Sequence, residues 1–245
     1  MRYKQNVIMK SIFIFLFGII SLQACAQQTV INDKNVEARD VSSFSGIKVS
    51  GGIDVYLSQG DDYSLAVSAA DIKYRDNIKT EIRNGILVIS YNSDHFKWNN
   101  ADKKLRAYIS FETIESLDAS GACDIIITST LNTNSMLLKL SGACDIKGPV
   151  KIRDLSMDLS GASTVKINGE VQNLNLTASG ASDLKNFDLI AENCVANLSG
   201  ASDVRITVKN SISGSASGAS SLHYNGSPNR GDVVTSGASS FSQRR

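Results

Sequence analysis

The chain has 245 residues, of which 20% are charged and 42% hydrophobic, with 18 Gly and only 2 Pro. This composition is typical of a folded chain and not of a disordered one. The 25 basic and 24 acidic side chains nearly balance, which argues against a protein that holds nucleic acid by charge. Two His and one Trp leave few candidates for histidine-based catalysis or for an aromatic stacking platform.

The N-terminus has the pattern of a secretory signal peptide. Three basic residues, Arg2, Lys4 and Lys10, precede an apolar run at residues 12–20, and small residues follow. Residues 22–25 (LQAC) resemble a bacterial lipobox, which predicts a signal peptide of residues 1–24 and a lipidated N-terminal Cys25. The alternative is ordinary cleavage after Ala26, which removes residues 1–26.

Export is expected with either cleavage site. Three basic and no acidic residues leave with the signal, so 22 basic and 24 acidic residues remain and the net charge becomes −2. We expect a bacterial envelope protein, which is an outer-membrane lipoprotein if Cys25 is lipidated and periplasmic or secreted otherwise. Residues 25–39 are expected to be a linker.

A Ser-Gly-Ala repeat is the strongest signal in the sequence. Its Gly recurs at positions 121, 142, 161, 180, 200, 218 and 237, in steps of 18 to 21 residues. Positions six, four and two before each Gly are mostly apolar, and the fourth position after it is always apolar. Because the positions between them are mostly polar, a strand with one buried face is predicted on each side of the Gly.

These units predict the fold class. One unit of about 19 residues cannot bury its own apolar face, whereas stacked units share a continuous core. We therefore expect an all-β fold, a right-handed parallel β-helix or β-solenoid with rungs of about 19–20 residues over residues 116–241. Each Gly would stand at a corner with positive φ. Residues 242–245 are expected to be a tail.

Residues 40–115 are less regular and are expected to begin the solenoid or to cap its end. Residues 47–57 repeat the order of strand, corner and strand, and residues 65–71 do so more weakly. Residues 78–90 predict a hairpin, because Asn84-Gly85 is a strong two-residue turn signal between alternating strands.

The order of several short motifs resembles a known family. They are residues 44–47 (FSGI), 50–55 (SGGIDV), 59–61 (QGD), 84–89 (NGILVI) and the Ser-Gly-Ala-x-Asp series. Over about residues 40–241 the chain resembles the putative auto-transporter adhesin, head GIN domain proteins of bacterial envelopes. The resemblance implies a secreted or lipid-anchored β-solenoid with an adhesin-like role. It carries over no catalytic residue.

Two columns of charged side chains are expected on one outer face of the repeat. The third position after the Gly is often Asp and the fifth is often basic, and residues two apart in a strand point to the same side. One interpretation is a ladder of compensating charges that keeps this face soluble. The other is a strip that binds an anionic glycan or cell-wall polymer, with candidate residues Lys147, Lys166, Lys185, Arg205, Asp145, Asp183 and Asp203.

Three cysteines lie in the predicted solenoid. Cys123 and Cys144 occupy the same place in successive units, close enough for a disulfide, and they are equally compatible with free stacked thiols. Other units have Ser163, Ser182 and Ser202 there. Cys194 falls in an inward column and is expected to be a small core residue.

No catalytic pattern is evident in the sequence. Acid/base hydrolysis needs two carboxylates in unlike environments, whereas these Asp residues are evenly spaced. They also lack the dense clustering that Ca²⁺ requires, so neither a metal nor another cofactor is expected. We expect a structural or adhesive module that binds a surface glycan or an envelope protein and meets a membrane only through its N-terminal lipid. The alternative is a solenoid that binds or cleaves an anionic polysaccharide.

Overall fold

The computed structural model of the chain describes residues 33, 35–91 and 102–244. The predicted signal peptide and Cys25 lie outside these residues. In the part that the structure describes, no helix is long and apolar enough to cross a membrane.

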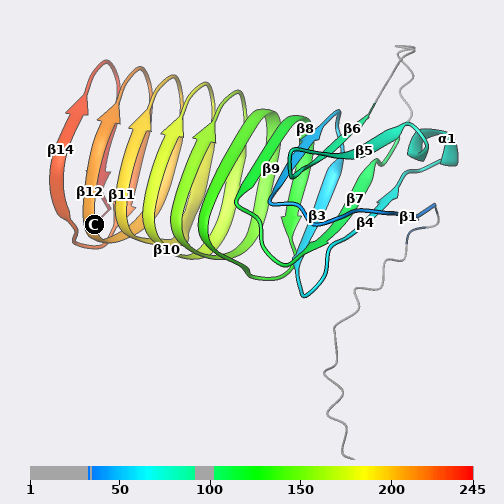
Figure 1. The fold of residues 1–245 in the computed structure, drawn as a ribbon. Helices are drawn as coiled ribbons and strands as arrows, with labels where there is room; N and C mark the ends of the chain where they lie inside the picture. The colour runs from blue at the N-terminus through cyan, green and yellow to red at the C-terminus, as the bar shows by residue number, and fades with distance from the viewer. Residues whose placement is uncertain (1–32, 34, 92–101, 245) are drawn as a thin grey trace, which may run out of the picture. The chain divides into compact units, whose positions relative to one another are not determined.

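Among the described residues, seven strands and one short helix precede the regular repeat, and Figure 1 shows them at one end of the stacked rungs. They are β1 (Glu37–Arg39), β2 (Gly46–Ser50), β3 (Asp54–Gln59), β4 (Ser64–Ser68), α1 (Ile72–Arg75), β5 (Ile78–Arg83), β6 (Ile86–Tyr91) and β7 (Arg106–Phe111). Strand β1 lies within the predicted linker 25–39 and pairs antiparallel with β4.

The repeat forms the remaining strands, several of which run through corners without a break. They are β8 (Ser116–Ile127), β9 (Leu131–Leu159), β10 (Thr164–Ala178), β11 (Asp183–Leu198), β12 (Asp203–Ala216), β13 (Ser221–Asn225), β14 (Asn229–Thr235) and β15 (Ser240–Gln243). Gln243 lies within the predicted tail 242–245.

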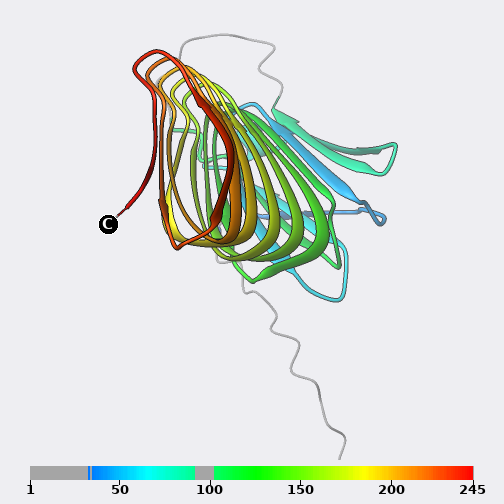
Figure 2. The same ribbon diagram turned by 90° about the vertical axis from the view of Figure 1, so that its left-hand side faces the viewer.

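These strands pair in parallel, each with its equivalent in the next rung. In β9 and β10, for example, Val165 stands beside Ile146 and Leu174 beside Leu155, as the 19-residue spacing of Gly142 and Gly161 requires. Figure 2 shows the rungs stacked one behind another. The predicted β-solenoid is confirmed, with about six turns of about 20 residues each.

The alternating apolar positions form one continuous core inside the rungs. Leu117, Ile125, Leu140, Met157 and Val204 are each no more than 1% exposed. Successive strand residues point to opposite faces, so the polar residues between them lie outside. Stacking therefore buries the apolar face that a single rung would leave in water.

The N-terminal region confirms two predictions and corrects a third. Strands β2 and β3 form a first rung, because both pair in parallel with β8. Strands β5 and β6 form the predicted antiparallel hairpin, with positive φ at Asn84 and Gly85. The weak repeat predicted at residues 65–71 is wrong: β4 pairs antiparallel with β7, and residues 69–71 lack a Gly for a corner and lead into α1.

Candidate functional site

The Ser-Gly-Ala corners fix where each outer face begins. The corner Gly residues have positive φ, for example +76° at Gly161 and +74° at Gly180. Directly after the corner, the Ala181 N–H donates to the Gly161 carbonyl of the preceding rung at 2.7 Å. Because Ala162, Ala201, Ala219 and Ala238 make the equivalent contact, the strand that follows each of these corners starts at the same height in its rung.

A buried hydroxyl column supports these corners from inside. Ser182 and Ser202 are no more than 1% exposed, and each hydroxyl donates to the carbonyl three residues earlier, at 2.8 and 2.9 Å. Such a bond satisfies a polar group that would be costly to bury alone. Cys144 occupies this column, with its Sγ 3.3 Å from the Ser141 carbonyl oxygen.

The structure aligns the two predicted charged columns on the strand segment that follows each corner. We call their members the charged strip: Asp54, Asp124, Asp145, Thr164, Asp183, Asp203, Lys147, Lys166, Lys185 and Arg205. Register pairs join Asp124 to Asp145, Lys147 to Lys166 and Lys185 to Arg205. The basic side chains are all exposed. Asp54 was not assigned to this column from the sequence, because its unit has Ser50-Gly51-Gly52 in place of Ser-Gly-Ala.

The two halves of the charged strip differ in ion pairing. Lys185 pairs with Asp183 at 2.6 Å, and Arg205 pairs with Asp203 at 2.9 Å. Thr164 takes the place of an acid beside Lys166, and within the described residues no carboxylate lies within 4.0 Å of Lys147 or Lys166. Direct ion pairs thus form toward β12, whereas Lys147 on β9 and Lys166 on β10 make none within 4.0 Å among the described residues.

Among the described residues, the surroundings of Asp54 and Asp33 shift the pKa values of their carboxyl groups in opposite directions. Burial raises the pKa of Asp54, although its carboxylate accepts a bond from the Asp124 N–H at 3.2 Å. The pKa of Asp33 is lowered, chiefly because the Tyr108 hydroxyl donates to its carboxylate, with further bonds from Ser68 and Arg106. Asp33 thereby holds the chain N-terminal to β1 against β7.

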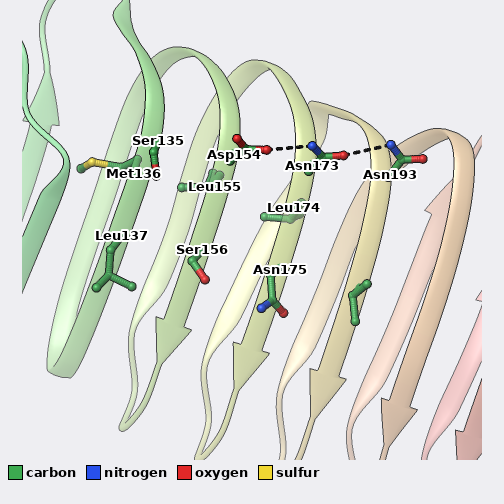
Figure 3. A pocket seen from close by; sticks show the side chains of 11 residues that line it. Ser135, Met136, Leu137, Asp154, Leu155, Ser156, Asn173, Leu174, Asn175 and Asn193 are labelled. Carbon is green, nitrogen blue, oxygen red and sulfur yellow. Dashed lines mark hydrogen bonds between the residues drawn. The ribbon is translucent and has the colours of Figure 1, made fainter.

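A shallow groove of about 420 Å³ crosses several rungs on the other side of the corners. Its upper edge is a ladder of polar side chains, in which Asn173 donates to Asp154 at 2.7 Å and Asn193 donates to Asn173 at 3.0 Å (Figure 3). Bonding from Asn173 lowers the pKa of Asp154. Outward side chains along the strands complete the lining: Leu137, Ser156, Asn175 and Val195.

The groove was not predicted from the sequence, although the repeat contains its signal. Asp154, Asn173 and Asn193 each lie seven residues before a corner Gly, so aligning the units places them in one column. Each amide in the ladder keeps hydrogen-bonding capacity after these contacts, because Asn has two donors and two acceptor lone pairs. Val195 is 44% exposed, which adds an apolar contact surface.

A comparison with known protein families identifies the family to which this chain belongs. The sequence profile of the putative auto-transporter adhesin, head GIN domain family matches residues 43–228. The chain belongs to this family. The resemblance carried by the motifs at residues 44–89 and by the repeat is therefore confirmed.

Solved structures share the head GIN domain fold. A putative adhesin from Bacteroides fragilis is 23% identical, with a TM-score of 0.75, and the match covers 86% of this chain and 98% of that one. A putative lipid binding protein from Parabacteroides distasonis is 20% identical, with a TM-score of 0.65 and coverage of 86% and 98%. A putative adhesin from Parabacteroides merdae is 15% identical, with a TM-score of 0.63 and coverage of 86% and 96%. No curated protein matches the chain.

The cysteines of this head GIN domain lie in the core. Cys123 and Cys144 stand side by side in β8 and β9, and Cys194 is 2% exposed in the inward column, as predicted. Among residues 33, 35–91 and 102–244, no three His, Cys, Asp or Glu side chains lie close enough to hold a metal ion.

Proposed function

We propose that this head GIN domain protein is an exported, non-enzymatic surface module that binds an anionic envelope glycan through the charged strip. The observation that carries the proposal is the column of exposed cations on successive rungs, in which Lys147 and Lys166 are register partners and, among the described residues, neither lies within 4.0 Å of a carboxylate. Cations that recur at the rung spacing of about 4.8 Å suit a polymer whose charges also recur.

Lys147 and Lys166 are the centre of the proposed site. Lys185 and Arg205 each hold a carboxylate within 3 Å, so a ligand would have to compete with Asp183 and Asp203 for them. The two unpaired lysines offer their charge without that competition. Since all four side chains are exposed, binding would weaken as salt screens them.

Binding to dextran sulfate, with uncharged dextran as the comparison, tests the proposal. We expect binding to dextran sulfate alone, and a loss of at least about tenfold in affinity for Lys147→Glu/Lys166→Glu, in line with the cost of reversing close charges. The control is Lys139→Glu/Lys209→Glu, which makes the same charge change outside the charged strip. Equal losses in both double variants would mean that net charge, and not the charged strip, governs binding.

We also propose that the protein is exported and that a lipid on Cys25 anchors it. The basic, apolar and small-residue order of residues 1–26 supports it, and the adhesin-like family is compatible with a surface location. The intact mass of the protein purified from envelope fractions shows whether its N-terminus carries a lipid. An unmodified start at Gln27 would refute lipidation, and recovery in the cytoplasm would refute export.

The carboxylates support binding better than hydrolysis. A glycosidase needs a proton-donating acid and a second carboxylate on either side of the scissile bond. The Asp residues of the charged strip instead repeat one per rung along the outer face, and burial raises the pKa of Asp54, which begins β3 at one end of the strip. Release of reducing ends from acidic polysaccharides by the purified protein would contradict the non-enzymatic proposal.

The groove favours a second candidate, the binding of an uncharged glycan segment. Amides and hydroxyls of Asn173, Asn175 and Ser156 can bond to sugar hydroxyls, and Val195 offers an apolar contact. Titration with neutral oligosaccharides is expected to shift NMR signals of these residues. Ser156→Trp would fill the groove and abolish the shifts, whereas Lys147→Glu/Lys166→Glu would leave them. Shifts that survive in Ser156→Trp would place the binding elsewhere.

A further inference from the structure

Two of the Ser-Gly-Ala rungs differ from the rest in the column that supports the corners. Ser163, Ser182 and Ser202 occupy it further along the solenoid, and all three are buried and bonded to a backbone carbonyl. In β8 and β9 the same position is Cys123 and Cys144. The thiols therefore stand in a column where serine also fits, but only cysteine could link adjacent rungs covalently.

The two free thiols are placed close enough for a disulfide to form with a small movement of their side chains. Cys123 and Cys144 are register partners in parallel strands, and neighbouring strands lie about 4.8 Å apart, within the range of Cα separations of disulfides. Their sulfur atoms are 2.9 Å apart and not bonded to each other in the structure, and the residues are 3% and 0% exposed. The two side chains thus point at each other in a site closed to solvent.

We propose that Cys123 and Cys144 form a disulfide that cross-links the first two regular rungs of the exported protein. The oxidant is a disulfide-bearing thiol oxidoreductase of an oxidising compartment. One cysteine thiolate attacks its disulfide and forms a mixed disulfide, and the second cysteine thiolate then displaces the oxidoreductase. One S–S bond forms in this chain, one breaks in the oxidoreductase, and two electrons and two protons leave the two thiols.

Burial sets the time at which this exchange occurs. Once β9 has stacked on β8, neither sulfur is accessible to a second protein. The exchange therefore takes place before the two rungs close, and the stacked core then protects the bond from reductants. This inference depends on export and not on the binding proposed above.

The bond would fix the point at which the repeat meets the N-terminal region. Strand β8 pairs on one side with β2 and β3 and on the other side with β9. A covalent link from β8 to β9 closes a loop between residues 123 and 144, which reduces the conformational freedom of the unfolded chain. The solenoid could then no longer separate at this junction without breaking a covalent bond.

The test uses full-length protein purified from the envelope of its host. It is unfolded in denaturant with iodoacetamide and without reductant, then digested with trypsin. Cys123 and Cys144 fall in separate tryptic peptides, residues 107–139 and 140–147, and Cys194 falls in residues 186–205. We expect the first two peptides to be joined, and the third to be alkylated, which shows that the reagent reached the unfolded chain.

Single variants provide the matched control. Cys123→Ser introduces the residue that other rungs use, so it is expected to fold and to leave Cys144 open to alkylation in denaturant. Separate, fully alkylated peptides from the wild type would overturn the proposal. So would a link from either cysteine to Cys194 or to a second molecule.

Discussion

Replacement of Gly180 by Ala tests the role of the corner in stacking. A Cβ at this position would lie 2.5 Å from the Gly161 carbonyl oxygen and 3.0 Å from the Gly161 nitrogen. Both atoms are backbone, and that carbonyl already accepts the bond from Ala181. The neighbouring rung therefore cannot yield by a simple side-chain rotation. The substitution combines an unfavourable φ with a steric clash.

Gly52 separates these two effects. Its φ of +73° matches the +74° of Gly180, but a Cβ there would meet its nearest atom at an ordinary 3.6 Å. Positive φ costs an L-residue about 1–2 kcal/mol, and Gly→Ala regains about 0.4–1 kcal/mol from the unfolded chain. We therefore expect Gly52→Ala to lose between about 0 and 1.6 kcal/mol in the free energy of unfolding. Gly180→Ala adds about 1–3 kcal/mol for overpacking.

Urea unfolding followed by far-UV circular dichroism measures both variants. The predicted difference between them is about 1–3 kcal/mol, with Gly180→Ala the less stable protein. Equal losses in the two variants would show that the close approach of neighbouring rungs costs nothing. The reasoning about the corner would then be refuted, and only its backbone conformation would matter.

Two further predictions concern the core and the N-terminal anchor. Met157→Ala should cost about 2–5 kcal/mol in the free energy of unfolding, because this side chain is fully buried, and a loss below about 1 kcal/mol would contradict close packing there. Asp33 has a lowered pKa in the folded state, so its stabilising effect is complete above the ordinary carboxyl value of 3.8 and disappears as pH falls through the lowered value. The urea concentration at the midpoint of unfolding should therefore be higher for the wild type than for Asp33→Asn at pH 7, and the two midpoints should converge in strong acid. A difference between the midpoints that is independent of pH would refute a stabilising role of the Asp33 carboxylate.

The repeat region was predictable because its signals are local and recur. Alternating apolar residues such as Leu155, Met157 and Leu159 define a buried face within one strand, and the Gly spacing sets the register between rungs. The Asn84-Gly85 turn was equally local, since two residues that tolerate positive φ are enough to fix a hairpin. The charged columns followed from the same alignment.

Other features depend on contacts that no periodic pattern encodes. Asp33 meets Ser68, Arg106 and Tyr108 across more than thirty positions of the sequence. Likewise, β4 pairs antiparallel with β7 because the chain reverses through α1 and the hairpin before it returns. Nothing in the composition of residues 64–68 distinguishes this arrangement from another rung.

The sequence by itself determined the solenoid, its buried columns and the two rows of charge on its face. A repeat transmits the conformation of one unit to all the others, so local rules are sufficient for these features. Only the tertiary structure decided which charges are compensated, where the groove lies and how closely the two thiols approach. These features depend on distances between side chains of different rungs. Lys147, Asn173 and Cys144 each acquire their neighbours from an adjacent rung, and only stacking brings those neighbours beside them.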